Sequence, residues 1–110
     1  MRIYGRDLRA VVVFHNYCPE AGVLEMSAAV ESKRWLSRPV LRAMHGYIFD
    51  DAGCQLAVMR VSENNMTMRR IAKAYGYDET LIPRLRGRNE AESILTLTDD
   101  DWNRSRFHAR

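Results

Sequence analysis

The sequence contains few cysteines, and it lacks any long apolar segment. Cys18 and Cys54 are its two cysteines among 110 residues, and they do not form a CxxC pair. A chain of this length can bury roughly two-thirds of the surface that it exposes when unfolded, so it needs no disulfide, and we expect reduced thiols in a cytoplasmic protein. No apolar stretch approaches the ~20 residues that span a bilayer, and the polar N-terminus has no apolar signal core. These absences predict neither export nor membrane insertion.

Lysine is also scarce, because 15 of the 17 basic residues are arginines. Arginine favours fixed pairing with phosphates or carboxylates over plain solubilising charge. The bases are concentrated at residues 32–49, which contain no acid, and at residues 69–88, whereas residues 89–102 are acidic. A formal net charge of +3 is too small for a general nucleic-acid-binding surface. The two basic segments could still form one anion site.

Motifs for a metal site or a cysteine nucleophile are missing. His15 and Cys18 are three residues apart, but His45 and Cys54 supply no second pair with the spacing of a zinc site. Cys18 stands beside Pro19 and has no neighbour in sequence that could orient it as a nucleophile. The sequence therefore predicts that no metal is bound.

Apolar periodicity predicts an ordered series of strands and helices over most of the chain. The expected order is a short strand at residues 2–4, strands at 10–17 and 23–30, a helix at 38–49, a strand at 54–62, a helix at 64–76, and strands at 81–85 and 93–98. These elements make one domain of residues 1–102. Residues 103–110 are expected to fray as a basic, flexible C-terminal tail.

The helix predicted at residues 64–76 has the clearest boundaries. Asn65 can cap its N-terminus, and Gly76 is expected to end it in a left-handed conformation. Helices after the third and fourth strands make crossover connections, so part of the sheet should be parallel, while the hairpins at both ends should be antiparallel. The sequence thus predicts an α/β fold with a mixed, partly antiparallel sheet and two crossover helices.

The order of these elements, together with two motifs, resembles the GNAT-type N-acetyltransferases. Residues 65–77, Asn-Met-Thr-Met-Arg-Arg-Ile-Ala-Lys-Ala-Tyr-Gly-Tyr, are similar to that family's asparagine, helix and Gly-Phe signature. Residues 25–39, Glu-Met-Ser-Ala-Ala-Val-Glu-Ser-Lys-Arg-Trp-Leu-Ser-Arg-Pro, resemble its fourth strand and pyrophosphate loop. Residues 56–61 fit the strand that splays from its neighbour to admit the cofactor. The resemblance extends over residues 8–98 and implies the acyl-CoA N-acyltransferase fold.

The chain departs from the family pattern at three places. The family loop follows Q/R-x-x-G-x-G/A, whereas here Arg34 keeps the leading base and Ser37 and Pro39 replace both glycines. Ala72 stands where the family often has a tyrosine as general acid. The family's leading strand and first two helices are expected to be absent, because the first long strand begins near Leu8. A chain shortened in this way is compatible with a phage or mobile-element origin.

The resemblance implies acetyl-CoA as co-substrate, with its pyrophosphate on the N-terminus of the first helix. Small residues on the preceding strand would let the pantetheine arm approach the backbone, and arginine side chains would pair with phosphate oxygens. The residues that the resemblance assigns to the cofactor are Ala28, Ala29, Val30, Lys33, Arg34, Trp35, Leu36, Ser37, Arg38 and Asn65. Alternatively, the loop bases are only solvated, Trp35 only anchors the loop, and Asn65 is a plain helix cap.

Catalysis would require an acceptor for the proton of the amine and a proton donor for the departing thiolate. Glu25 on the central strand could receive the amine proton through water. Tyr75 is the nearest phenol on the second helix and could act as the acid. Each has a structural alternative, since Tyr75 lies on the apolar stripe of its helix and Glu25 could simply be exposed or paired.

Three functions are consistent with these patterns. The first is transfer of an acetyl group from acetyl-CoA to an amine acceptor, for which a protein amine is one option. The alternative is a GNAT-fold protein that has lost catalysis and binds or inhibits a partner protein, as the lost glycines and Ala72 would suggest. A nucleic-acid-binding domain fits least, because only Trp35 and Tyr77 could stack on bases.

We also expect a homodimer. Without the family's N-terminal elements, a sheet edge and an apolar face would be left uncovered, which natural sheets seldom tolerate. A second subunit would cover them.

Overall fold

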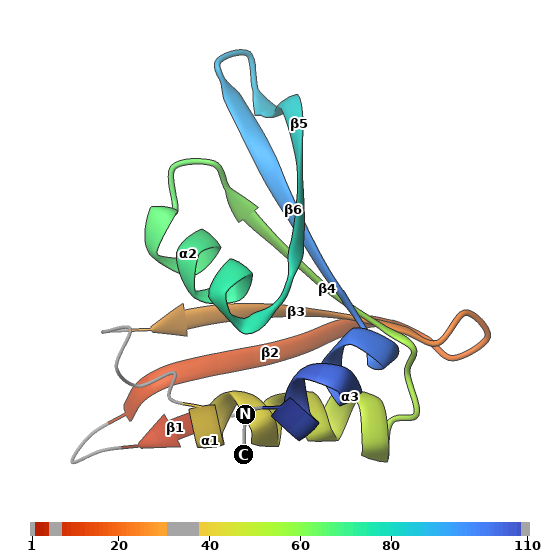
Figure 1. Ribbon diagram of the computed structural model, residues 1–110. Coiled ribbons are helices and arrows are strands. Elements are labelled where there is room, and N and C mark those ends of the chain that lie inside the picture. Colours follow the sequence, from red (N-terminus) through yellow and green to blue (C-terminus); the bar gives the residue numbers. More distant parts are fainter. Residues whose placement is uncertain (1, 5–7, 31–37, 109–110) are drawn as a thin grey trace.

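The computed structural model describes residues 2–4, 8–30 and 38–108, which form one six-stranded sheet and its flanking helices (Figure 1). The strands are β1 (Arg2–Tyr4), β2 (Leu8–Cys18), β3 (Val23–Val30), β4 (Leu56–Ser62), β5 (Asp78–Gly87) and β6 (Glu90–Thr98). The helices are α1 (Arg38–Gly46), α2 (Met66–Tyr75) and α3 (Asp99–His108), and a π-helical turn, η2 (Tyr47–Asp51), continues α1. None of these described helices combines the length and the hydropathy needed to cross a membrane.

The sheet is mixed, with strand order β1-β2-β3-β4-β6-β5. β3 and β4 are parallel neighbours joined through α1, and the remaining neighbouring pairs are antiparallel. α2 connects β4 to β5, which run in the same direction with β6 between them. The predicted mixed sheet with two crossover helices and a hairpin at each end is therefore confirmed.

β5 is longer than the sequence predicts. The acidic residues Asp78 and Glu79 disfavour a strand locally, but in the structure they pair with Thr96 and Leu95 of β6. Tertiary pairing thus extends the strand on its N-terminal side. Near its other end the register shifts between Ile82 and Gly87, and the hairpin projects beyond the other strands (Figure 1).

The C-terminal segment forms α3 instead of the frayed segment expected from residue 103. Asp99, Asp100 and Asp101 occupy its first turn, where carboxylates complement the partial positive charge of a helix N-terminus. Trp102 is 2% exposed, and its ring lies 5.2 Å from that of Phe49. Burial of this indole anchors the helix to the core, which local sequence patterns did not show.

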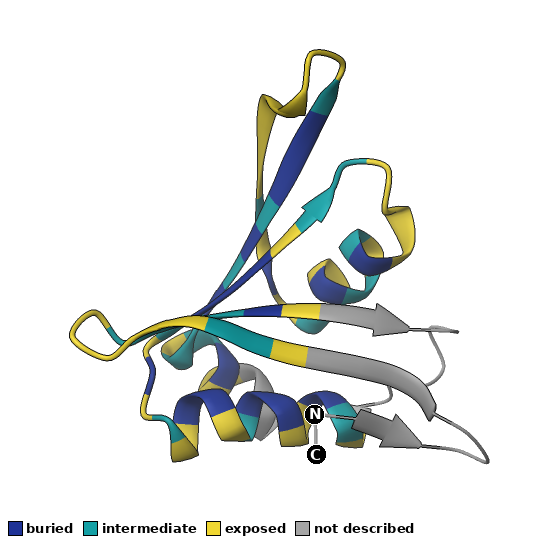
Figure 2. Cartoon of the chain, turned by 180° about the vertical axis from the view of Figure 1, so that it is seen from behind, coloured by how far each residue is buried: buried dark blue, intermediate teal, exposed yellow. Residues whose placement is uncertain are grey.

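One face of the sheet packs against the helices. The alternating β3 residues Leu24 and Met26 join one buried cluster with residues of α1, η2, α2 and α3. Facing residues of β4 and β6, such as Met59 and Leu95, belong to the same cluster. The inward sides of α1 and α2 are correspondingly buried (Figure 2).

The opposite face is mixed in character among the described residues. Arg60 of β4 lies between two carboxylates, with its Nε 3.3 Å from Glu25 and an Nη nitrogen 3.9 Å from Glu92. Apolar side chains on the same face are Val13, at 53% exposure, Val58, Ile94 and Ile82. A sheet face that carries such charged pairs can be exposed to water. The homodimer stays a prediction.

Candidate active site

The parallel strands β3 and β4 separate part-way along their length. Their last paired residues are Met26 and Met59. Beyond this point β3 runs to Val30 beside β2, whereas β4 runs to Ser62 beside β6. Figure 1 shows the two strands diverging. In the described pairing, the backbone of β3 that faces this opening has no β4 partner, so its amide groups can bind a ligand.

The predicted cofactor residues fall into two groups. Some flank this opening or begin α1, and the others lie outside the described residues. Ala28, Ala29 and Val30 lie in β3 past the point of divergence and pair with β2 on their other side. Arg38 is the first residue of α1. Lys33, Arg34, Trp35, Leu36 and Ser37 lie outside the described residues. The N-terminus of a helix such as α1 is a favourable place for phosphate.

Both predicted ends of the α2 helix are confirmed. Asn65 caps the N-terminus, where its Oδ1 accepts a hydrogen bond from the backbone N–H of Met68 at 3.2 Å. Gly76 ends the helix with a φ of 124°, a value that few residues other than glycine adopt. The capping alternative for Asn65 is thus realised. A contact between this exposed residue and a pantetheine arm stays a prediction.

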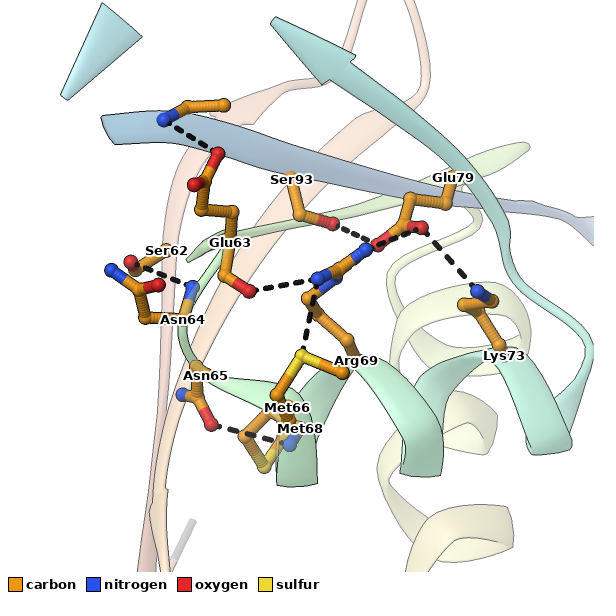
Figure 3. A network of polar contacts seen from close by, with 11 residues as sticks. Ser62, Glu63, Asn64, Asn65, Met66, Met68, Arg69, Lys73, Glu79 and Ser93 are labelled. Carbon is orange, nitrogen blue, oxygen red and sulfur yellow. Dashed lines mark hydrogen bonds and ion pairs between the residues drawn. The ribbon is translucent and has the colours of Figure 1, made fainter. Parts of the chain in front are cut away.

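A polar network that sequence patterns did not indicate fastens α2 to the sheet (Figure 3). Arg69 donates hydrogen bonds to the Glu79 carboxylate at 2.6 Å and to the backbone carbonyl of Glu63 at 2.7 Å. The buried Ser93 hydroxyl also donates to Glu79 at 2.6 Å, and the Lys73 ammonium lies 3.4 Å away. The Arg69 and Ser93 hydrogen bonds hold the pKa of Glu79 at about 2. The network fixes α2 relative to β5, β6 and the turn after β4.

Replacing Arg69 with methionine is expected to lower the thermal unfolding midpoint by several degrees at neutral pH, because Glu79 loses its main partner. The adjacent, exposed Arg70 lies outside this network, and Arg70→Met is the matched control with little expected effect. The folded-state pKa of Glu79 is depressed, so its contribution is present above pH 4.5 and is lost as the pH falls towards 2. Calorimetric scans at pH 7 and pH 3 should show a smaller gap between the variants in acid. An equal gap at both pH values would contradict the ion-pair explanation.

The outer side of α2 forms a basic groove of about 430 Å³. Its lining residues are Met66, Arg69, Arg70, Lys73 and Ala74. Arg69 and Lys73 both contact Glu79, which offsets part of their charge. The groove could accept an anionic group through Arg70. Within the described residues, no group of three or more His, Cys, Asp or Glu side chains is arranged to hold a metal ion.

Glu25 lies on the sheet face opposite the helices, one residue before the divergence of β3 and β4. Its side chain is 13% exposed, and its carboxylate accepts a hydrogen bond from Asn16 Nδ2 at 3.1 Å. Arg60 Nε lies 3.3 Å from the same carboxylate, and His15 Nδ1 lies 3.5 Å from it. Glu25 is therefore paired. It also lies beside the opening between β3 and β4, where its carboxylate could take a proton from a bound ligand.

Tyr75 lies on the other side of the sheet, among the helices. Its hydroxyl accepts a hydrogen bond from Trp102 Nε1 at 3.0 Å, and its ring lies 4.7 Å from that of His45. These contacts support the core interpretation of Tyr75. The structure does not bring Glu25 and Tyr75 together.

The buried imidazole of His45 was not predicted to be part of any site. His45 is 0% exposed; its Nδ1 donates to the backbone carbonyl of Leu41 at 2.7 Å, and its Nε2 accepts from the Tyr77 hydroxyl at 2.6 Å. Burial lowers the pKa of His45 to about 4 and raises that of Tyr77 well above its usual value. The one sequence signal for this role is the position of His45 four residues after Leu41, on the apolar side of its helix.

Comparison with known proteins identifies the fold. No protein-family model matches the sequence, and no curated protein does. Among solved structures, a candidate acetyltransferase from T. thermophilus is similar with a TM-score of 0.77 and 14% identity, over 94% of this chain and 60% of that one. The F149A mutant of the spermidine N-acetyltransferase SpeG from Vibrio cholerae gives 0.76 and 14% identity, over 90% and 63%. A GCN5-related N-acetyltransferase from Brucella melitensis gives 0.71 and 20% identity, over 89% and 48%.

These similarities establish the fold. The chain has the fold of the GNAT-type acetyltransferases, as the sequence motifs suggested, and it spans about 60% of the length of the first of these structures.

Proposed function

We propose that this protein is an N-acetyltransferase that binds acetyl-CoA where β3 and β4 diverge and transfers the acetyl group to an amine. The observation that carries the proposal is the end of β3–β4 pairing at Met26 and Met59. An extended pantetheine arm contains amide groups, which suit a strand edge with unpaired backbone N–H and C=O groups. The acetyltransferase fold of the similar structures supports a thioester donor.

The phosphates of the cofactor would lie at the start of α1. Arg38 begins this helix, and its N-terminus favours anions. The loop bases Lys33 and Arg34 and the Ser37 hydroxyl would add charge-assisted contacts in place of the backbone approach that the family's glycines permit. These assignments, and those of Trp35 and Leu36, are proposals from the sequence motif.

The reaction would be a direct attack of the amine on the thioester carbonyl. Glu25 would receive the amine proton, directly or through one water, and the departing thiolate would be protonated from solvent or from the same carboxylate. Backbone N–H groups of β3 past Met26 would hold the developing oxyanion. The contacts of Tyr75 with Trp102 and His45 place it away from Glu25, so we assign it no step.

The acceptor would be a cationic amine. Glu25 and Glu92 lie on the same sheet face as the opening and attract positive charge, although Arg60 between them offsets part of it. The similar Vibrio cholerae protein is a spermidine N-acetyltransferase, and protein lysines or N-termini carry the same ammonium group. An acceptor screen should therefore contain polyamines, lysine peptides and free N-termini.

Acetyl-CoA is expected to bind with an affinity that falls as the salt concentration rises, because arginine–phosphate pairs contribute to it. Arg34→Ala and Arg38→Ala should each weaken binding by roughly 1–3 kcal/mol, the range for a charged hydrogen bond. Arg104→Ala is the matched control, because Arg104 lies on α3 and pairs with Asp101. Titration calorimetry with acetyl-CoA and desulfo-CoA measures these values. A wild-type protein that gives neither heat nor a thermal shift with either compound would refute cofactor binding.

A binding protein that has lost catalysis is the second candidate. Ala72, in place of the family's frequent tyrosine, is 3% exposed and packs in the core, so it offers no acid. Tight binding of acetyl-CoA with no transfer to any amine in the screen would favour this function. Acetyl transfer at a rate that depends on Glu25 would exclude it.

A further inference from the structure

Three side chains on β2 and β3 form a chain of polar contacts on the sheet face opposite the helices. The Ser27 hydroxyl lies 2.9 Å from His15 Nε2. The other ring nitrogen, His15 Nδ1, lies 3.5 Å from the Glu25 carboxylate. His15 and Glu25 are directly opposite each other in the β2–β3 pairing, and Ser27 follows Glu25 by two residues on the same face. The three groups thus stand in the order hydroxyl, imidazole, carboxylate.

This order and the choice of ring nitrogens are those of an activated serine, with His15 Nδ1 in ion-pair contact with Glu25 at 3.5 Å and not hydrogen bonded to it. A hydroxyl is a weak nucleophile until a base takes its proton, and an imidazole acts as that base when its other nitrogen donates to a carboxylate. Asn16 and Arg60 hold the Glu25 carboxylate at 3.1 and 3.3 Å, which fixes its position. Arg60 also offsets part of the negative charge of Glu25. The carboxylate of Glu25 would therefore orient the His15 ring more than it would raise the basicity of that ring.

Ser27 lies beside the opening between β3 and β4, where an acyl donor could bind. Ser27 is exposed, and it is the first residue of β3 after Met26, the last residue that pairs with β4. Ser27 therefore lies where the two strands begin to diverge. The following residues of β3 present backbone N–H groups that could hold an oxyanion.

We propose that Ser27 is an acyl-accepting nucleophile, with His15 as its general base and Glu25 as the positioning residue for His15. Ser27 Oγ attacks the carbonyl carbon of an activated acyl donor while His15 Nε2 takes the hydroxyl proton. The C–S bond of a thioester, or the C–O bond of an ester, then breaks, and His15 returns the proton to the leaving group. The resulting acyl-serine ester is hydrolysed by water, which makes this reaction separate from the direct transfer to an amine.

This inference rests on the proposed function only for the identity of the natural donor. The test therefore needs a donor that does not depend on cofactor binding, and p-nitrophenyl acetate is such a donor.

The experiment measures release of p-nitrophenol from p-nitrophenyl acetate by the full chain, and it identifies the acylated residue by peptide mass spectrometry. The wild type should form an acetyl ester at Ser27, and the same serine should react with a fluorophosphonate probe.

Ser27→Ala should lower the rate of p-nitrophenol release by about 10²-fold, and His15→Gln by a similar factor. Glu25→Gln should lower kcat more than it raises KM. Thr80→Ala is the matched control, because Thr80 is an exposed hydroxyl residue on the same face, and it should leave the rate unchanged.

Each outcome separates this inference from the proposed function. Loss of ester formation in Ser27→Ala, together with acetyl-CoA binding, supports both. Ester formation at Ser27 without any binding of acetyl-CoA supports the nucleophile and refutes the proposed cofactor. Binding of acetyl-CoA with p-nitrophenol release that is the same in wild type, Ser27→Ala and Thr80→Ala overturns the inference and leaves the proposed function standing. Circular dichroism of Ser27→Ala guards against a folding defect, and Ser27→Cys should restore acylation at this position as an acetyl thioester.

Discussion

Replacing Glu25 with glutamine is expected to lower the rate of acetyl transfer by about 10²–10³-fold, the range for loss of a positioned proton acceptor. The amide keeps the size of the side chain, and it can still accept a hydrogen bond from Asn16, but it cannot take a proton. Binding of acetyl-CoA should change little, because Glu25 lies on one face of β3 and not along its open edge. Steady-state assays with thiol detection measure the rate, and calorimetry measures the affinity.

Tyr75→Phe is the contrasting variant for the same assay. The ring is retained, and the hydroxyl that accepts from Trp102 is lost, so a small loss of stability and a nearly unchanged rate are expected. A rate lowered by about 10²-fold or more in Tyr75→Phe would show that this phenol is the acid after all. An unchanged rate in Glu25→Gln would remove Glu25 from the reaction.

Acidification from pH 6.5 to pH 4 is expected to lower the free energy of unfolding by about 3 kcal/mol through His45 alone. Burial lowers the folded-state pKa of His45 to about 4 from the ordinary value of 6.5. Between these values the unfolded chain binds a proton that the folded chain does not, so stability falls as the pH falls. The described rings around it, those of Phe49, Tyr75 and Tyr77, are uncharged at these pH values and cannot stabilise an imidazolium by ion pairing.

His45→Gln isolates this effect. The variant should be less stable than the wild type at pH 7, because the hydrogen bonds to Leu41 and Tyr77 are lost, but its stability should depend much less on pH in this window. Urea unfolding at several pH values measures both. A wild type with constant stability down to pH 4 would contradict a neutral, buried His45.

Local signals determined the order of the elements and several of their ends. The two predicted boundaries of α2, Asn65 and Gly76, are correct because a cap and a left-handed stop depend on a single residue and its immediate neighbours. β3 occupies the predicted residues 23–30 for a similar reason, since alternation is a property of consecutive side chains. The order of these elements was enough to suggest the fold that the similar structures share.

Contacts between distant residues were decided by the tertiary structure. Trp102 makes α3 part of the core through Phe49, and Glu79 stays in a strand because β6 pairs with it and Arg69 neutralises it. Neither partner can be identified from the neighbouring sequence. Glu25 and Tyr75 could both be named as candidates, but only burial showed that they lie on opposite sides of the sheet.

The serine–histidine–carboxylate arrangement shows the limit most clearly. Counting back from the turn, where Cys18 pairs with Val23, an uninterrupted hairpin would place His15 opposite Met26. In the structure the register shifts between His15 and Cys18, where Asn16 adopts a positive φ of 51°, and His15 faces Glu25 instead. A shift of one residue moves every side chain beyond it to the other face of a strand. The sequence by itself supplied the three residues, and a single bulge in β2 decided that they meet.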